Sequence, residues 1–510
     1  MKKLIHITIA AIVISVIAPG CKKSFNDLNQ NPNKPIAVPP SLLLNGVLYD
    51  MYDQPYSDYE KWSQYFIINY DYYGNNRYDF GSGASYFSTL KNVKKMEEEA
   101  ININSPALNP YEALAKFFKA YFFTKMSLEM GDMPMSEALQ GISNLKPVYD
   151  PQKLVFQQAF AWLDSANMDM GQMVASGNYI LAGDFYFDND LSKWQKVVNT
   201  YRLRLLLHLS LKATDPDLNV KQQFADIIGN PSKYPIMESM DDNLQFQFTY
   251  PTNSYPNNPS NFGFDALRYN CSATYVGLLT QLKDPRVFVT SEPAAAIVDG
   301  GVSPTSFAAF VGASPGEDLG AMYIKANSGQ YSLINRKHYY DTYTAEPSIQ
   351  IGYPELLFNI AEAINRGWIN SGPLGDAEAH YQAGIKASMA YYGIPETGPF
   401  NVYFLHPGAS LGTYDTYTVN VDFPTYYNQV AVKYSGNDAN GLNQILTQRY
   451  LALFRHSGLE SYFTYRRTGV PTFTTGPGTG NSERIAWRFQ YPTSEKTANI
   501  ENYQATLASQ

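Results

Sequence analysis

The chain has 510 residues, of which 45% are apolar and 16% are charged, and its formal net charge is −8. That length exceeds the ~250–300 residues at which one hydrophobic core stops growing, so more than one core is expected. The acidic balance argues against nucleic-acid binding, which needs a basic surface for phosphate contacts. Aromatic residues make up 15% of the chain and 41 of them are Tyr, whose hydroxyl suits a wet boundary with a polar ligand.

The first twenty residues have the pattern of a secretory signal. Lys2 and Lys3 precede an apolar run over residues 4–18, which is shorter than the ~20 residues of a membrane-spanning helix. Pro19, Gly20 and Cys21 come next, and a cysteine after the apolar core is typical of bacterial lipoproteins, where it becomes the lipidated N-terminus. We therefore expect a signal peptide and a lipid on Cys21, and the alternative is plain secretion after cleavage near Gly20.

Apolar residues at helical spacing predict a series of helices along the rest of the chain. In chain order they cover residues 112–130, 151–173, 194–209, 275–282, 354–364, 377–389 and 442–468. Amphipathic helices of this length are typical of antiparallel helical hairpins stacked into a solenoid-like scaffold.

The stretches between these helices have the composition of loops. Residues 69–80, 250–270, 294–350 and 401–434 are rich in Tyr, Asn, Pro, Gly or Thr, which predicts turns with a few short strands. Loops longer than ~15 residues are usually functional surfaces. The sequence therefore predicts a helical frame that carries long, aromatic-rich loops.

Metal and cofactor chemistry find little support in the sequence. Cys271 is the only cysteine besides Cys21, so neither a disulfide nor a thiolate zinc site is expected once Cys21 is acylated. The histidines form no His-Glu-x-x-His motif, and His208 is expected to be a hydrogen-bonded core residue on a helix. No cofactor is predicted.

An acidic cluster before the third predicted helix is a calcium candidate. Its residues are Asp184, Asp188 and Asp190. They lack the spacing of a calcium-binding loop, and acidic residues at a helix start are favoured by the helix dipole in any case.

Catalytic motifs are present only as superficial matches. Residues 312–316 and 408–412 read Gly-x-Ser-x-Gly, but Pro315 cannot lend the N–H that an oxyanion hole needs, and the second match lacks a preceding buried strand. A helical glycosidase or lyase stays an alternative function, although no pair of carboxylates is nominated by the sequence.

Motifs along the mature chain occur in a characteristic order. They include Asp-Leu-Asn-Gln-Asn-Pro-Asn at 27–33, a helix ending in Gly-Asp-Met-Pro at 131–134, Asp-Pro-Arg at 284–286 and Arg-Arg-Thr-Gly at 466–469. In this order the chain resembles the SusD/RagB family of nutrient-binding outer-membrane lipoproteins, in its SusD-like branch. Arg466 and Arg467, at a helix end, are expected to pair with carboxylates inside the frame.

The resemblance implies a mainly α fold, with a tetratricopeptide-like scaffold of helical hairpins and a loop-rich insertion subdomain that contains few strands. It divides the chain into a signal peptide over 1–20, a lipidated tether over 21–40 and a SusD-like domain over 41–510. Within that domain the scaffold is expected mainly in 41–250, 350–395 and 440–470, and the loop-rich binding parts mainly in 250–350, 395–440 and 470–510.

The resemblance also implies a function without catalysis. Family members are anchored in the outer membrane by their lipid alone and face the cell exterior. They capture an oligosaccharide, or sometimes a peptide, and pass it to a SusC-like TonB-dependent transporter. A helical-repeat scaffold for protein partners is a further alternative.

Two loop segments supply the predicted ligand contacts, because aromatic faces with planar polar groups suit sugars. The first contains Tyr70, Tyr72, Tyr73, Asn75, Asn76, Arg77 and Tyr78, and the second contains Tyr255, Asn257, Asp265 and Arg268. The alternative is that these tyrosines pack against the helical frame with only their hydroxyls exposed.

Overall fold

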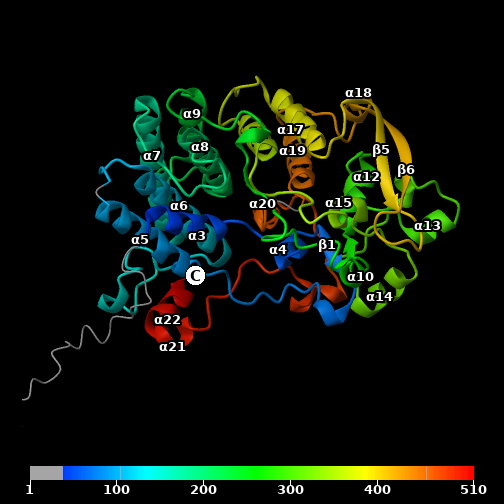
Figure 1. The fold of residues 1–510 in the computed structure, drawn as a ribbon, viewed down its shortest axis with the longest axis horizontal. Coiled ribbons are helices and arrows are strands. Elements are labelled where there is room, and N and C mark those ends of the chain that lie inside the picture. The colour runs from blue at the N-terminus through cyan, green and yellow to red at the C-terminus, as the bar shows by residue number, and fades with distance from the viewer. Residues whose placement is uncertain (1–37, 104, 455–456, 510) are drawn as a thin grey trace, which may run out of the picture. The chain divides into compact units, whose positions relative to one another are not determined.

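Helices dominate the computed structural model, which describes residues 38–103, 105–454 and 457–509 (Figure 1). The expected signal peptide and Cys21 lie outside these residues. The longer helices are α3 (Pro40–Tyr49), α5 (Phe87–Asn102), α6 (Pro110–Met130), α7 (Gln152–Ser176), α8 (Leu191–His208), α9 (Val220–Gly229), α11 (Ala273–Gln281), α14 (Leu319–Asn327), α16 (Tyr353–Asn365), α17 (Ala377–Tyr391), α19 (Ala439–Ala452), α20 (Glu460–Thr468) and α22 (Ile500–Ser509). The short ones are α4 (Asp58–Trp62), α10 (Phe262–Asp265), α12 (Val287–Thr290), α13 (Ala295–Asp299), α15 (Arg336–Tyr340), α18 (Phe423–Tyr427) and α21 (Glu495–Ala498).

The mainly α fold class predicted from the sequence is confirmed. The predicted helices correspond to α6, α7, α8, α11, α16 and α17, with ends that differ by a few residues. The prediction of one helix over 442–468 is wrong, because α19 and α20 are separate helices there. Gly458 lies between them with a φ of +55°, a left-handed conformation that does not continue an α-helix.

Neighbouring helices pack as hairpins, which gives the frame its layered order. α6 packs on α5 and α7, α7 packs on α8, and α16 packs on α17 and α19. The Asn109 side chain caps the start of α6 by accepting from the N–H of Glu112, and Gly131 ends the helix with φ +96°. Between these ends α6 is buried on nearly all sides. It is therefore the central helix of its hairpin layer.

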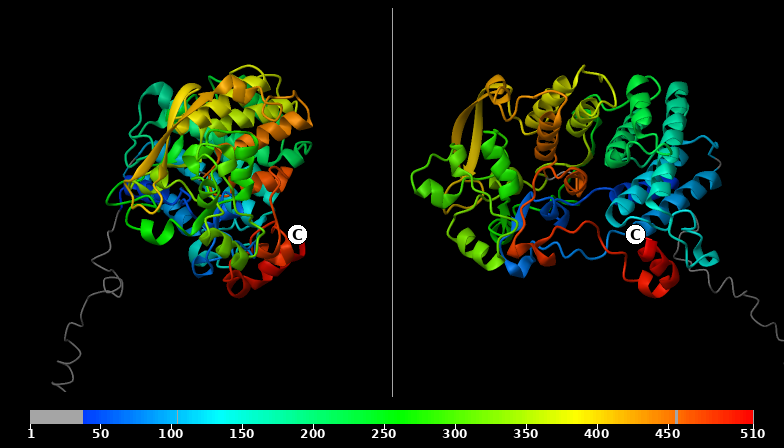
Figure 2. Two further views of the ribbon diagram at one scale, coloured as in Figure 1. Left: turned by 90° about the vertical axis from the view of Figure 1, so that its right-hand side faces the viewer. Right: turned by 180° about the vertical axis from the view of Figure 1, so that it is seen from behind.

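Two large clusters of buried residues form the interior, as the length of the chain predicts. One joins α3 and α5–α9, at the left of Figure 1, and the other surrounds α11, α15, α17 and α19. The end of the chain returns to the first cluster, so that α21 and α22 lie with the N-terminal helices in both figures (Figure 2). Tyr149 anchors this return by donating to Glu495 at 2.7 Å.

The sheets are small, antiparallel and two-stranded. β1 (Phe66–Ile68) pairs with β3 (Tyr269–Cys271), β2 (Leu244–Phe246) with β4 (Ser348–Ile351), and β5 (Thr397–Leu405) with β6 (Tyr414–Asp422). The β5–β6 hairpin occupies most of the predicted loop 401–434, where Tyr, Thr and Val alternate. Among the described helices, none combines the length and the apolar character that crossing a membrane requires.

Candidate functional site

The loop after β1 is held at both ends by asparagine side chains. Asn76 accepts from the N–H of Ile68 at 2.9 Å and donates to its carbonyl at 2.7 Å. Asn69 donates to the carbonyl of Leu267 at 2.9 Å. Both asparagines are buried, and the chain between them makes a short 3₁₀ turn that leaves Tyr72 79% exposed. The loop is therefore a fixed platform for its aromatic side chains.

Tyr70, Tyr72 and Tyr323 form a tyrosine surface at this loop. The ring centroid of Tyr70 lies 6.3 Å from that of Tyr72 and 5.5 Å from that of Tyr323, which is 38% exposed. The guanidinium of Arg268 lies 4.3 Å from the centre of the Tyr70 ring, a cation–π contact. Exposed rings beside a planar cation offer stacking faces and directed hydrogen-bond donors to a polar ligand.

The two loop segments predicted separately meet at this surface. β1 pairs with β3 in a register that places Ile68 opposite Tyr269, and the N–H of Asn69 donates to the carbonyl of Arg268 at 3.1 Å. Asp265 ends α10 a few residues earlier, and burial raises the pKa of its carboxyl while Arg268 opposes that shift. The structure therefore brings Tyr70, Arg268 and their neighbours together (β1, α10 and α14 at the lower right of Figure 1).

Four of the predicted ligand contacts are interior side chains. They are Asn76, Tyr78, Tyr255 and Asn257, each at most 6% exposed. Tyr78 donates to the carbonyl of Trp62 at 3.0 Å, and Asn257 donates to the hydroxyl of Tyr340 at 3.0 Å. These residues follow the alternative interpretation, packing against the frame, and we set them aside from the ligand site.

Two further predicted residues lie on the surface with their polar groups engaged. Asn75 accepts from the N–H of Arg77 at 2.9 Å, and the guanidinium of Arg77 lies 2.5 Å from a carboxylate oxygen of Asp79. The side chain of Tyr73 lies outside what the structure describes.

Sequence reasoning missed Tyr323. It lies on α14, which begins where Asp318 accepts from the N–H of Ala321 at 3.0 Å, a local capping signal inside the predicted loop 294–350. Met322 is fully buried beside Ile67 of β1. This contact holds α14 against β1 and so keeps Tyr323 near Tyr70.

In the acidic cluster before α8, two of the three carboxylates accept hydrogen bonds from neighbouring groups of the fold. Asp184 accepts from the indole N–H of Trp194 at 2.8 Å, and Asp190 caps α8 by accepting from the N–H of Ser192 at 2.9 Å. Asp188 is exposed and adopts a positive φ of 53°. Within the described residues, no group of three His, Cys, Asp or Glu side chains is placed to hold a metal ion. The calcium hypothesis is therefore not supported.

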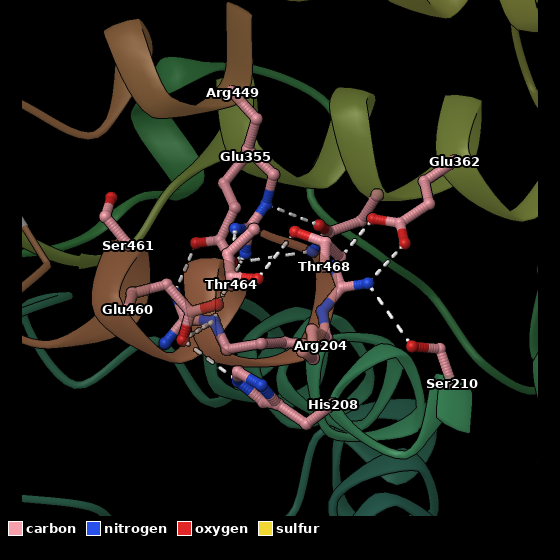
Figure 3. Close-up of polar contacts among 12 residues, drawn as sticks. Arg204, His208, Ser210, Glu355, Glu362, Arg449, Glu460, Ser461, Thr464 and Thr468 are labelled. Carbon is pink, nitrogen blue, oxygen red and sulfur yellow. Dashed lines mark hydrogen bonds and ion pairs between the residues drawn. The ribbon is translucent and has the colours of Figure 1, made fainter. Parts of the chain in front are cut away.

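Buried ion pairs join α8, α16, α19 and α20 (Figure 3). Arg449 donates to Glu355 at 2.8 Å and to Glu460 at 2.5 Å, and Nε of Arg204 donates to Glu355 at 2.7 Å. His208 Nε2 lies 3.0 Å from Glu460, which confirms the prediction of a hydrogen-bonded core histidine. None of these side chains is more than 8% exposed. The cluster therefore holds the frame together and is closed to a ligand.

The arginine pair at the end of α20 fits the prediction for one member only. Arg467 pairs with Glu362 at 2.5 Å, as expected, and Arg366 reaches the same carboxylate at 2.8 Å. Burial favours a raised pKa for Glu362, but the two guanidinium groups outweigh it and lower the pKa to about 2. The prediction of a carboxylate partner is wrong for Arg466, because its guanidinium donates to the backbone carbonyl oxygens of Trp487 at 2.9 Å and Leu128 at 2.8 Å.

Glu129 has the raised pKa that a glycosidase acid needs but lacks access to a substrate. Burial raises its pKa to about 7, although the N–H of Ala84 and the ammonium of Lys125 oppose the shift. The cavity that it lines measures about 40 Å³. Ligand pockets measure ~300–1,000 Å³, so a sugar ring cannot enter this cavity.

Comparisons with known proteins agree on one family. A SusD-like family model described as starch-binding associating with outer membrane matches residues 32–492. A SusD homolog from Bacteroides fragilis NCTC 9343 is similar at 31% identity and a TM-score of 0.78, covering 93% of this chain and 97% of that chain. A Bacteroides vulgatus ATCC 8482 protein, assigned to the outer membrane and to nutrient binding, has 28% identity and a TM-score of 0.76 over 93% and 97% of the two chains.

More distant structures share the fold. A chitin-binding SusD homolog from Flavobacterium johnsoniae has 19% identity and a TM-score of 0.67, covering 92% of this chain and 95% of that chain. No curated protein matches the sequence. The family model spans nearly the whole chain, and its match agrees with the helical frame, so this chain belongs to the SusD-like family.

Proposed function

We propose that this protein is a non-catalytic lipoprotein of the outer membrane that captures an oligosaccharide at the tyrosine surface and delivers it to a SusC-like TonB-dependent transporter. The observation that carries the proposal is the cluster of exposed Tyr72 and Tyr323 around the Tyr70–Arg268 pair. The family description, starch-binding associating with outer membrane, and the chitin-binding relative support a glycan as the ligand.

Binding at this surface needs no bond to be made or broken. The apolar faces of sugar rings stack on Tyr72 and Tyr323, and ring hydroxyls accept from Arg268 and donate to Asp265. Because Asn69 and Asn76 hold the loop rigidly, little conformational entropy is lost when the glycan binds.

Replacing the exposed rings should weaken glycan binding without unfolding the protein. We expect Tyr72→Ala and Tyr323→Ala each to raise the Kd for the bound oligosaccharide about tenfold, since an aromatic stacking contact contributes about 1 kcal/mol or more. Titration calorimetry with maltoheptaose and chitohexaose measures the change. Tyr403→Ala is a matched control, because Tyr403 is also 38% exposed but lies on β5.

Unchanged glycan affinity in both variants would contradict ligand binding at the tyrosine surface. Binding of peptides with no glycan response would assign the ligand to the peptide class. Release of reducing ends during incubation would contradict the non-catalytic proposal.

Cys21 provides a test of the anchor. We expect Cys21→Ser to move the protein from the outer-membrane fraction to the soluble fraction, because a lipidated cysteine is the proposed attachment. Fractionation with immunoblotting measures this distribution, and co-purification of the wild type with a TonB-dependent transporter tests the partner. A Cys21→Ser variant that stays with the membrane would contradict lipid attachment at this residue.

A further inference from the structure

A second hollow lies beside the base of the β5–β6 hairpin, where β6, α12 and α18 meet at the upper right of Figure 1. Its volume is about 350 Å³. Ligand pockets begin at ~300 Å³, so this hollow suits one small ring and is too small for a polymer segment. Its lining includes Lys283, Phe288, Phe307, Asn420 and Asp422, and it shares no residue with the tyrosine surface.

One wall of the hollow is aromatic and fixed. The rings of Phe288 and Phe307 lie 5.0 Å apart between centroids. Phe288 is 4% exposed and belongs to the second core cluster, while Phe307 is partly exposed at the rim. Val421 and Tyr426, both 6% exposed, continue this apolar wall. The wall therefore offers an apolar face that the core holds in place.

The lining also includes polar side chains, and two of them have no protein partner within the described residues. In the part of the chain that the structure describes, the side chains of Lys283 and Asn420 make no hydrogen bond or ion pair. Asp422 uses Oδ2 to accept from both the N–H and the hydroxyl of Thr425, so Oδ1 is left for another donor. The lining thus supplies a donor, an amide and an acceptor around one space.

The backbone at Lys283 is fixed by a buried ion pair. Lys283 has a positive φ of 52°, and the next residue, Asp284, binds Arg286 at 2.7 Å with both side chains fully buried. The hydroxyl of Tyr426 also donates to Asp284 at 2.5 Å. The ammonium group therefore extends from a rigid point at the pocket edge.

We propose that this pocket binds a single neutral sugar ring. The charges of Lys283 and Asp422 balance, which favours a neutral ligand over an anion. A sugar ring presents an apolar C–H face to Phe307 and hydroxyls to Lys283, Asn420 and Asp422, the combination that the lining provides. The inference rests on the proposed function in its ligand class, and it adds a second site for one ring.

Ligand-observed NMR with glucose and N-acetylglucosamine, the units of starch and chitin, tests the pocket. We expect millimolar binding, as is usual for so small a ligand, and at least about a tenfold rise in Kd for the double variant Lys283→Ala/Asn420→Ala. Both side chains are exposed and unpaired, so the double variant should fold as the wild type does. Lys433→Ala/Asn428→Ala is the matched control, because these exposed residues lie outside the pocket.

The outcomes separate this inference from the proposed function. Monosaccharide binding that persists in Tyr72→Ala and is lost in Lys283→Ala/Asn420→Ala supports the pocket, even if maltoheptaose and chitohexaose fail to bind. Oligosaccharide binding at the tyrosine surface without any monosaccharide response contradicts sugar binding in the pocket and leaves the proposed function unaffected. Equal weakening in the pocket and control double variants also contradicts sugar binding in the pocket.

Discussion

Replacing Arg449 by methionine is expected to lower the free energy of unfolding by about 3–5 kcal/mol. Its guanidinium is 2% exposed and holds Glu355 and Glu460, while Nε donates to Asn359 at 2.9 Å. Methionine fills much of the same volume but leaves two buried carboxylates with fewer partners. The loss therefore reflects uncompensated buried charge, and denaturant unfolding at pH 7 followed by circular dichroism measures it.

Arg77→Met is the matched control for this effect. Arg77 also pairs with a carboxylate, that of Asp79 at 2.5 Å, but its side chain is 56% exposed. An exposed ion pair contributes about 0–1 kcal/mol, so we expect little change in stability. Equal losses in the two variants would contradict the role assigned to burial. A loss below about 1 kcal/mol for Arg449→Met would show that the frame does not depend on this network.

The frame could be predicted because each long helix carries its own apolar periodicity. α6, α7 and α8 bury their faces against one another, and a local pattern is enough to find such elements. The break between α19 and α20 could not be found in this way. Its local signal is Gly458, which lies between the two helices with a positive φ of 55°, and a single glycine inside a long apolar pattern does not by itself mark a helix end.

The tyrosine surface could be predicted only in part, for a different reason. Tyr70 and Tyr72 stand out by local density, but tyrosine type alone does not say which rings face solvent, and Tyr78 proved to be buried. The pairing of β1 with β3, which brings Arg268 to Tyr70, involves three residues on each strand. So short a strand leaves no period to detect, and sequence reasoning therefore treated the two halves of the site as separate candidates.

Glu129 is expected to make the protein less stable as the pH rises from about 4.5 to 7. Burial raises the pKa of its carboxyl to about 7, above the ordinary value near 4.5 that applies in the unfolded chain. Between these values the folded state keeps a proton that the unfolded state has released, so stability falls with rising pH. The shift corresponds to about 3 kcal/mol at pH 7 and above.

Glu129→Gln should remove this part of the pH dependence. Glu129 accepts from the N–H of Ala84 at 2.7 Å, and an amide oxygen can accept the same bond without ever ionising. Burial lowers the pKa of His208, which lines the same cavity, so His208 acts in the opposite direction: stability falls as the pH drops below about 6.5. The quantity to measure is therefore the difference between variant and wild type at each pH, in which the contribution of His208 cancels.

Denaturant unfolding from pH 4.5 to 8 should show the stability of Glu129→Gln relative to the wild type rising by about 3 kcal/mol across the window. Glu98→Gln is the control, because the Glu98 side chain is 50% exposed on α5. A constant difference for Glu129→Gln would mean that its carboxyl ionises at the same pH in the folded and unfolded chains. That result would require water to reach the group freely, in conflict with a side chain that has no exposed surface.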